Sequence, residues 1–536
     1  MPEINLNRSP EAIREESIEN EIKQETLDKK KKIGILYKRE IDPNDGKEKS
    51  YVYIANPYES HPTLVKVEIG ATEEEVEAIK KAIIPMQETH DILVTLATTY
   101  KLGQPVLIEG PTAVGKTYVT EKFNELLWGK GVKPLDFYCS GQTDVSELMA
   151  RWVPKVETAE DRKKWVEFLE LADTKAQLGN ISQEVAQKEE LPQEQRLALI
   201  HTRIQELAKS AGLSDKTQWK LQYGAIPRAM GLIRNSDGTY SHSDTEGTGF
   251  TLHIEEVGLA EPQVINALLK LRGKRGKTAD SIQLWENGGR TVKAGPRFWM
   301  VMTTNPPEEY ISRNEIDPAL ARGVVFKRVG ELSEESLKLA AEHYFTYKTG
   351  ERAEGKPDGC ILDLREHPEI GREISEIVAV FHNEFNKRLK AGGEKGRQQR
   401  IPLSLDDFSR VSDYILGVQI RSKESGYVDL TETLRRAVQL YYLDRLADKD
   451  FKDGMKRHFE EILTGVTGQK VFEGTAMKRS EILKTLVERA SVSTQDIGQE
   501  VDHLEDVIGQ AASDGGLPEH IRERLRKMAQ KQQQSS

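Results

Sequence analysis

The chain has 536 residues, of which 31% are charged, and its formal net charge is −10. This length exceeds what one hydrophobic core supports, so three or more domains are expected. The acidic balance gives no global reason to bind nucleic acid, and no apolar run approaches the roughly 18 residues that span a bilayer. Only two cysteines occur, Cys139 and Cys360. Two distant cysteines argue against a disulfide framework and against a cysteine zinc site. Together with the lack of a signal-peptide pattern, they favour a cytoplasmic protein.

The first 75 residues combine a charged arm with a small β-rich module. Residues 8–32 are dense in charge and end in a run of lysines. This pattern favours a solvated helix or arm, with a nucleic-acid contact as the alternative. Strands are predicted at 33–37, 51–54 and 64–68, and a turn at 44–46 is predicted between the first two. Thr72 and Glu75 match a capping box, so a helix is expected to begin there.

The segment from Gly110 to Thr117 satisfies the phosphate-binding P-loop pattern. It follows a short buried strand at 105–109 and precedes a helix with apolar spacing at 118–128, which is the context this loop requires. The residues predicted to hold ATP are Gly110, Pro111, Thr112, Ala113, Val114, Gly115, Lys116 and Thr117. Backbone N–H groups are expected to face the phosphates. Lys116 should reach the β- and γ-phosphates, and the Thr117 hydroxyl should coordinate Mg²⁺.

Hydrolysis needs acidic residues at the end of a neighbouring strand. The apolar strand at 250–254 is followed by Glu255 and Glu256. Glu255 is predicted to hold Mg²⁺, and Glu256 to act as general base or to position the attacking water. The strand at 298–302 leads to Asn305, whose amide could hold the water or the γ-phosphate; an asparagine before proline is also common in turns.

The remaining segments are predominantly helical by composition and apolar spacing. Residues 157–221 interrupt the α/β alternation and predict an inserted helical pair whose apolar stripes pack together or on the core. A hairpin is expected from 281 to 294 around a Gly-rich turn. Helices dominate 333–450 and 451–536, and the chain ends in a basic, glutamine-rich tail that is expected to be flexible.

In this order the motifs resemble those of the AAA+ ATPases, within them the MoxR-like and dynein-related (midasin-like) group, over about residues 77–450. The segment 110–117 resembles Walker A, and 252–262 resembles the group's Walker B. Residues 302–308 resemble sensor 1, and 316–322 resemble its arginine-finger segment.

The resemblance implies an α/β fold: a P-loop AAA+ core, with a parallel sheet flanked by helices, followed by a helical lid. The expected organisation is an N-terminal arm and β-rich module, the core with its helical insertion, the lid, and a helical C-terminal region with a basic tail. In the same order, these four parts cover residues 1–75, residues 76–332 with 157–221 as the insertion, residues 333–450 and residues 451–536. The family also implies a ring, usually a hexamer, in which Arg322 reaches the γ-phosphate bound by the neighbouring subunit.

Two positions depart from the family pattern. The family usually has aspartate where this chain has Glu255, and the extra methylene pushes the carboxylate outward by about 1.5 Å. The family often has an arginine in the first turn of the sensor-2 helix, where this chain has Asp406 and Asp407. Arg400 and Arg410 are the candidates to replace that arginine.

The resemblance implies an ATPase that remodels or assembles a protein complex, with a von Willebrand factor A domain protein as a possible client. A nucleotide-gated scaffold with little hydrolysis is a second hypothesis, motivated by Glu255 and Asp406. A nucleic-acid-coupled motor is a third, supported only by basic segments at 29–32, 272–277 and 522–531. A solvated loop or contact with an acidic client also accounts for the segment 272–277.

Overall fold

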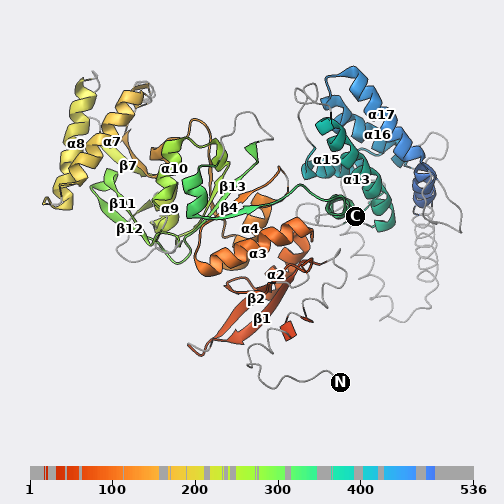
Figure 1. Ribbon diagram of the computed structural model, residues 1–536, viewed down its shortest axis with the longest axis horizontal. Coiled ribbons are helices and arrows are strands. Elements are labelled where there is room, and N and C mark those ends of the chain that lie inside the picture. Colours follow the sequence, from red (N-terminus) through yellow and green to blue (C-terminus); the bar gives the residue numbers. More distant parts are fainter. Residues whose placement is uncertain are drawn as a thin grey trace, which may run out of the picture. The chain divides into compact units, whose positions relative to one another are not determined.

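The computed structural model forms two compact units, residues 1–336 and 337–536 (Figure 1). The residues that the structure describes are 17–18, 20–21, 32–42, 45–59, 63–112, 114–155, 167–169, 171–188, 190–210, 218–231, 233–234, 240–241, 249–271, 273, 277–307, 316–346, 362, 364, 366–391, 403–420, 428–465, 478–488 and 490.

A parallel five-stranded sheet forms the centre of the first unit. Its strands are β4 (Val106–Glu109), β5 (Leu135–Tyr138), β10 (Thr251–Glu255), β13 (Trp299–Thr304) and β14 (Val325–Arg328). The spatial order is β14-β4-β13-β10-β5, so β13 lies between the P-loop strand and the acidic strand. The strand that leads to Asn305 therefore separates the acidic strand from the P-loop strand and lies beside both. The predicted α/β fold class, a parallel sheet flanked by helices, is confirmed.

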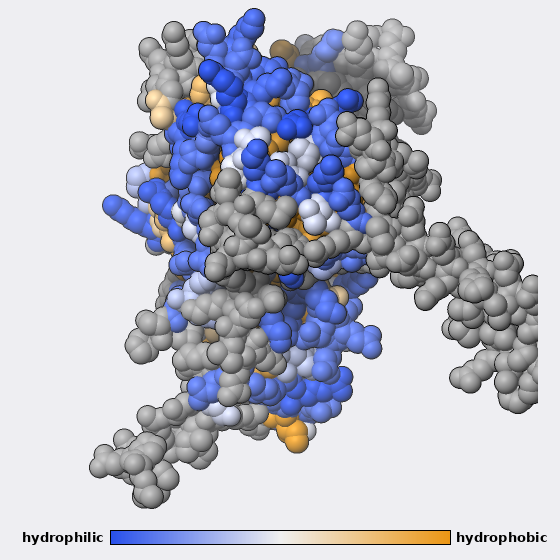
Figure 2. All heavy atoms as spheres, turned by 90° about the vertical axis from the view of Figure 1, so that its right-hand side faces the viewer, coloured by the Kyte–Doolittle hydropathy of each residue, from blue (hydrophilic) through white to orange (hydrophobic). Residues whose placement is uncertain are grey.

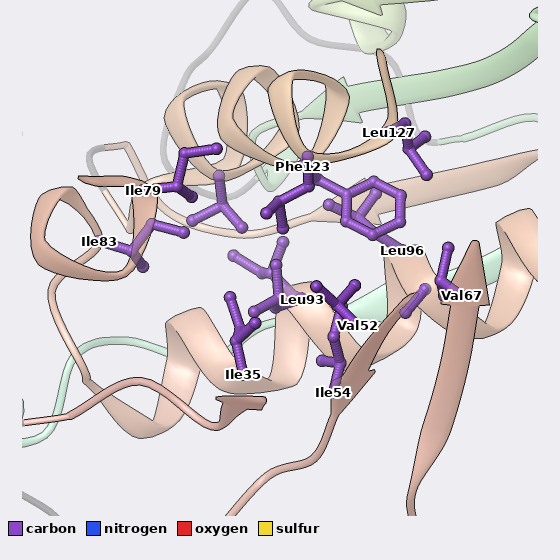
Figure 3. Close-up of a cluster of buried hydrophobic side chains, with 14 of the residues drawn as sticks. Ile35, Val52, Ile54, Val67, Ile79, Ile83, Leu93, Leu96, Phe123 and Leu127 are labelled. Carbon is purple, nitrogen blue, oxygen red and sulfur yellow. The ribbon is translucent and has the colours of Figure 1, made fainter. Parts of the chain in front are cut away.

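One face of this sheet is covered by helices that also support the N-terminal β-sheet. These elements are β1 (Ile35–Ile41), β2 (Glu48–Ile54), β3 (Val65–Ile69), α2 (Glu73–Ala82), α3 (Gln87–Leu102) and α4 (Lys116–Trp128). The three strands pair antiparallel in sequence order. Figure 3 shows Val52 and Ile54 of β2 beside Leu93 and Leu96 of α3, with Phe123 of α4 above them. Sheet, helices and central strands therefore share one apolar core, which fixes α4 and its N-terminal loop.

The opposite face packs on short helices and the predicted hairpin. The elements here are α5 (Val145–Leu148), α9 (Ala225–Met230), η1 (Val257–Leu259), α10 (Pro262–Leu269), β11 (Ser281–Leu284), η3 (Trp285–Asn287) and β12 (Arg290–Lys293). The short strands β8 (Ile233–Arg234) and β9 (Tyr240–Ser241) pair nearby in the chain.

Strand alternation divides the side chains of β10 between the two faces of the sheet. Leu252 and Ile254 enter the core on the α10 side, so His253 and Glu255 point to the side of α4.

The inserted helices extend from a two-stranded antiparallel ribbon. The ribbon consists of β6 (Ala150–Lys155) and β7 (Gln218–Tyr223), and the helices are α7 (Ala172–Ala186) and α8 (Gln193–Ser210). Val185 from α7 is buried together with Ile200 and Ile204 from α8, and the two isoleucines belong to an apolar stripe that the sequence predicted. The Trp152 indole donates a hydrogen bond to the Glu286 carbonyl, which links the insertion to the hairpin turn.

The principal elements of the second unit are helices. Its helices are α12 (Glu334–Thr346), α13 (Pro368–Ala391), α15 (Leu405–Gly417), α16 (Leu430–Tyr441), η6 (Leu443–Arg445) and α17 (Lys449–Thr464). Helix α12 begins three residues before the unit boundary. Four aromatic side chains meet at the centre of this helical unit: Phe381, Phe385, Phe459 and Tyr442.

The described surface in Figure 2 is mostly hydrophilic, with hydrophobic residues in small separate spots. Among the helices that the structure describes, none is long and apolar enough to cross a bilayer. Cys139 is buried and is not in a disulfide.

Candidate active site

The P-loop connects β4 to α4 and begins and ends with a glycine. Gly115 is the N-cap of α4 and has φ +85°, a left-handed conformation that glycine adopts without strain. A Cβ atom on Gly110 would lie only 3.1 Å from the Val329 carbonyl oxygen. Glycine therefore suits position 115 because of its dihedral angle, and position 110 because of the close approach of the Val329 backbone. Val114 is buried in the core, and Ala113 lies outside the described residues.

Lys116 is largely buried, with 8% of its surface exposed. Its ammonium donates hydrogen bonds to the Gly110 carbonyl at 2.6 Å, the Pro111 carbonyl at 2.7 Å and Asn305 Oδ1 at 2.7 Å. These acceptors are the loop backbone and a strand-end amide. An ammonium offers three N–H donors, so contact with a phosphate oxygen requires exchange of one of these bonds.

Thr117 and Glu255, the two residues predicted to hold Mg²⁺, are in direct contact. The Thr117 hydroxyl donates a hydrogen bond to Glu255 Oε2 at 3.0 Å. Glu255 is the last residue of β10, and its side chain spans from the strand to the first turn of α4. The extra methylene relative to aspartate therefore supplies reach in this chain.

Asn305 joins the lysine to the second glutamate. Its amide nitrogen donates to Glu256 Oε1 at 3.0 Å, while its oxygen accepts from Lys116. Glu256 has φ +56° and is the one non-glycine residue with positive φ in the described part of the chain. Such a conformation costs about 1–3 kcal/mol and is concentrated at functional sites. It turns the chain out of β10 while the Glu256 carboxylate stays within reach of Asn305.

A further polar group lies on the same face of the sheet as Glu255. The fully buried His253 places Nδ1 3.0 Å from Asp136 Oδ1 of β5, and Nε2 3.4 Å from the Thr303 hydroxyl of β13. Glu121 of α4 approaches this group from the helix side. Burial, and after it repulsion by Asp136, raises the pKa of the Glu121 carboxyl group. A hydrogen bond to Glu255, followed by burial, raises the pKa of Tyr138 to about 12.

The donor set fits a nucleotide and Mg²⁺. A hydroxyl and a carboxylate oxygen, both hard ligands, meet at the N-terminus of α4, and Mg²⁺ in nucleotide sites uses one or two protein oxygens with the phosphates. A left-handed glycine, here Gly115, at the N-terminus of a helix is the backbone arrangement that P-loops use for phosphate.

Arg322 belongs to a different element from the residues described above. It is an exposed residue near the end of α11 (Pro318–Gly323), a short helix capped by Asp317. No hydrogen bond joins it to the chain's own P-loop among the residues described. Of the basic segments, residues 29–31, 272, 274–276 and 522–531 lie outside the described residues.

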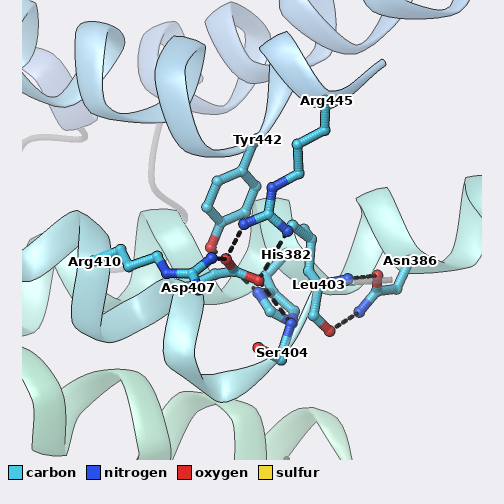
Figure 4. Close-up of polar contacts among 8 residues, drawn as sticks. All are labelled: His382, Asn386, Leu403, Ser404, Asp407, Arg410, Tyr442 and Arg445. Atoms are coloured by element: carbon cyan, nitrogen blue, oxygen red, sulfur yellow. Dashed lines mark hydrogen bonds and ion pairs between the residues drawn. The ribbon is translucent and has the colours of Figure 1, made fainter. Parts of the chain in front are cut away.

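Asp407 lies in the helix turn where the resembled family often has an arginine, and it binds two arginines of its own chain. Its carboxylate is 1% exposed and accepts hydrogen bonds from Arg445 of η6 and, at 3.3 Å, from Arg410 (Figure 4). It also accepts from the Ser404 backbone N–H at 2.8 Å and so completes the cap of α15. Asp407 is thus a structural anchor of the helical unit. Arg400, the other candidate for sensor 2, lies outside the described residues.

Sequence reasoning did not single out His253, Asp136 and Thr303. The available signal was a titratable residue inside an apolar strand, two positions before Glu255, because period-two alternation places both on one face. The contact itself depends on the pairing of β10 with β5 and β13, which the sequence does not specify.

Comparisons with known proteins matched the chain to solved structures at low identity and low structural similarity. No protein-family model and no curated protein match the chain. Among solved structures, a candidate ATPase from Cytophaga hutchinsonii ATCC 33406 is similar over 78% of this chain and 93% of its own, with 11% identity and a TM-score of 0.27. NtrX from Brucella abortus is similar over 77% of this chain and 71% of its own, with 12% identity and a TM-score of 0.30. Values this low do not assign an activity, so the function has to be argued from the site.

Proposed function

We propose that the chain binds and hydrolyses ATP with Mg²⁺ and acts, as a ring of subunits of the AAA+ kind, to remodel or assemble a protein complex. The observation that carries this proposal is the hydrogen-bonded series from Lys116 through Asn305 to Glu256, beside the Thr117–Glu255 pair. A phosphate-binding lysine, a metal-binding pair and a carboxylate thus converge at one edge of the sheet, as phosphoryl transfer to water requires.

Each residue has a distinct task in this proposal. The loop backbone and Lys116 bind the β- and γ-phosphates, and Thr117 and Glu255 hold Mg²⁺, which when bound neutralises charge on the transferred phosphoryl group. Glu256 orients the attacking water and accepts its proton. Asn305 positions that carboxylate, to which it donates at 3.0 Å. A neighbouring subunit supplies Arg322, whose exposure near the end of α11 suits this role.

The direct contact between Thr117 and Glu255 favours hydrolysis over the scaffold hypothesis, because the glutamate side chain reaches the metal-binding hydroxyl. The choice of client rests on the family resemblance alone. A von Willebrand factor A domain protein is the partner class to test first, by co-purification from the source cell.

Substitution Glu256→Gln tests the assignment. Loss of the carboxylate should lower steady-state phosphate release by about 10²–10⁴-fold while nucleotide affinity persists. Glu261→Gln changes an exposed glutamate at the N-cap of α10 and serves as the matched control. Equal turnover in wild type and Glu256→Gln contradicts the role of Glu256, and failure of the wild type to bind ATP contradicts the whole proposal.

A further inference from the structure

His253 and Asp136 have no task in the proposed hydrolysis, yet with Glu255 they are arranged for ligation. Asp136, His253 and Glu255 each present one ligand atom, and these three atoms all lie within 4.8 Å of one another. The three residues come from two adjacent strands, β5 and β10, in register. A rigid parallel sheet therefore holds them together, which is a better support for a metal site than a loop.

We propose that Asp136, His253 and Glu255 bind a second divalent cation, of the transition-metal class that imidazole ligands favour. Carboxylate oxygens alone suit Mg²⁺ or Ca²⁺, whereas one histidine with two carboxylates suits zinc, cobalt or manganese. Three protein ligands also leave a coordination position open, as in zinc enzymes. The site shares Glu255 with the proposed nucleotide centre, and to that extent rests on the proposed function.

The histidine has the outer support that metal-binding histidines usually show. Its Nε2 lies 3.4 Å from the Thr303 hydroxyl, and this contact orients the ring with Nδ1 toward Asp136 and Glu255. The ring is fully buried, so protein atoms hold it in this orientation. Nδ1 lies 3.0 Å from Asp136 Oδ1 and 3.9 Å from Glu255 Oε1.

The two oxygens of Glu255 face different partners. Oε2 accepts the hydrogen bond from Thr117. Oε1 is buried and lies on the side of His253, 3.9 Å from Nδ1, while Tyr138 also hydrogen-bonds to this carboxylate. One carboxylate can thus bridge two ions, which in two-metal sites are about 3.5–4 Å apart. This gives a physical reason for glutamate at a position where the resembled family has aspartate.

Cobalt binding to the full chain tests the proposal without nucleotide. The protein is stripped with a chelator and dialysed against Co²⁺ with excess Mg²⁺, which competes for the oxygen ligands at Thr117. The wild type should retain Co²⁺ in a stoichiometric amount and show the visible absorption of ligated cobalt. Asp136→Asn should weaken this binding by at least about tenfold, since it removes the charge but keeps an oxygen that can accept from His253. Thr117→Ala should retain cobalt.

His253→Gln is a second variant of a proposed metal ligand. The melting temperature of each variant, measured without metal, reports whether that variant folds. Folded wild type that retains no Co²⁺, or folded Asp136→Asn that binds it as tightly as wild type, overturns the proposal; the group is then a structural hydrogen-bond network. Cobalt retention in Glu256→Gln separates this result from the proposed hydrolysis, because that variant loses turnover but keeps all three ligands.

Discussion

Two buried charges, one in each unit, have contrasting surroundings. Lys116 in the first unit donates to two backbone carbonyls and the Asn305 amide. Asp407 in the second unit accepts from two guanidinium groups, those of Arg410 and Arg445. These three neutral acceptors of Lys116 can be exchanged for phosphate oxygens, whereas removing one member of a buried ion pair leaves the other charge uncompensated. The first arrangement therefore suits ligand binding, and the second suits folding.

The largest effect should come from breaking the structural charge. Asp407→Ala is expected to destabilise the helical unit by about 3–5 kcal/mol, because it leaves the half-buried Arg445 without its counter-ion. Asp406→Ala, in the same first turn but exposed, is the control and should cost about 0.3–1 kcal/mol through the helix dipole. Denaturant unfolding followed by circular dichroism measures both. Equal destabilisation by the two substitutions would remove the contrast between Asp407 and Lys116.

The lysine should show the reverse pattern, a loss of affinity with a smaller loss of stability. Lys116→Met keeps the length of the side chain but removes the charge, and the affinity for ATP should fall about 100-fold, the value of a charge-assisted hydrogen bond. The unfolding free energy should fall less than in Asp407→Ala, because removal of the buried ammonium offsets part of the cost, about 1–3 kcal/mol, of leaving its acceptors without a donor.

Lys122→Met is the matched control on the same helix, where Lys122 forms a surface ion pair with Glu125. Calorimetric titration with ATP and thermal unfolding report the two quantities separately. If Lys116→Met unfolds as readily as Asp407→Ala, the two charges serve the same purpose.

Each unit also contains a buried histidine whose charge is disfavoured. Burial lowers the pKa of His90 and of His382 to about 4. His90 accepts a hydrogen bond from the Gly34 N–H at Nε2, and its Nδ1 lies 2.6 Å from the Met86 carbonyl. The unfolded chain takes up protons near pH 6.5 while both folded histidines stay neutral, so stability is complete above that pH and falls as the pH drops toward 4.

The expected slope within this window approaches about 1.4 kcal/mol per pH unit for each histidine. Unfolding at pH 7.5, 6 and 5 measures it, and His382→Gln should flatten the dependence for the helical unit alone. A slope that is unchanged in this variant would mean that His382 is already charged in the folded state.

Local features of the sequence predicted most of the elements correctly. The capping box at Thr72 and Glu75 forms as expected, and the P-loop joins a strand to a helix because its glycines and apolar spacing are local signals. The partners of Asp407 and His253 were not predictable in this way. Arg445 is 38 residues from Asp407, and Asp136 is 117 residues from His253. Such contacts depend on which helices and strands become neighbours, and this follows from packing of the whole core.

The smallest expected effect concerns Glu255, where the chain and the resembled family differ. Glu255→Asp shortens the side chain, so the 3.0 Å hydrogen bond to the Thr117 hydroxyl should be lost, at a cost of about 1 kcal/mol. Mg²⁺-dependent turnover should then fall several-fold, while ATP affinity without Mg²⁺ stays the same because Lys116 and the loop are untouched. A magnesium titration of phosphate release distinguishes the two quantities. Faster turnover in Glu255→Asp would show that glutamate hinders the site, and would return the scaffold hypothesis to first place.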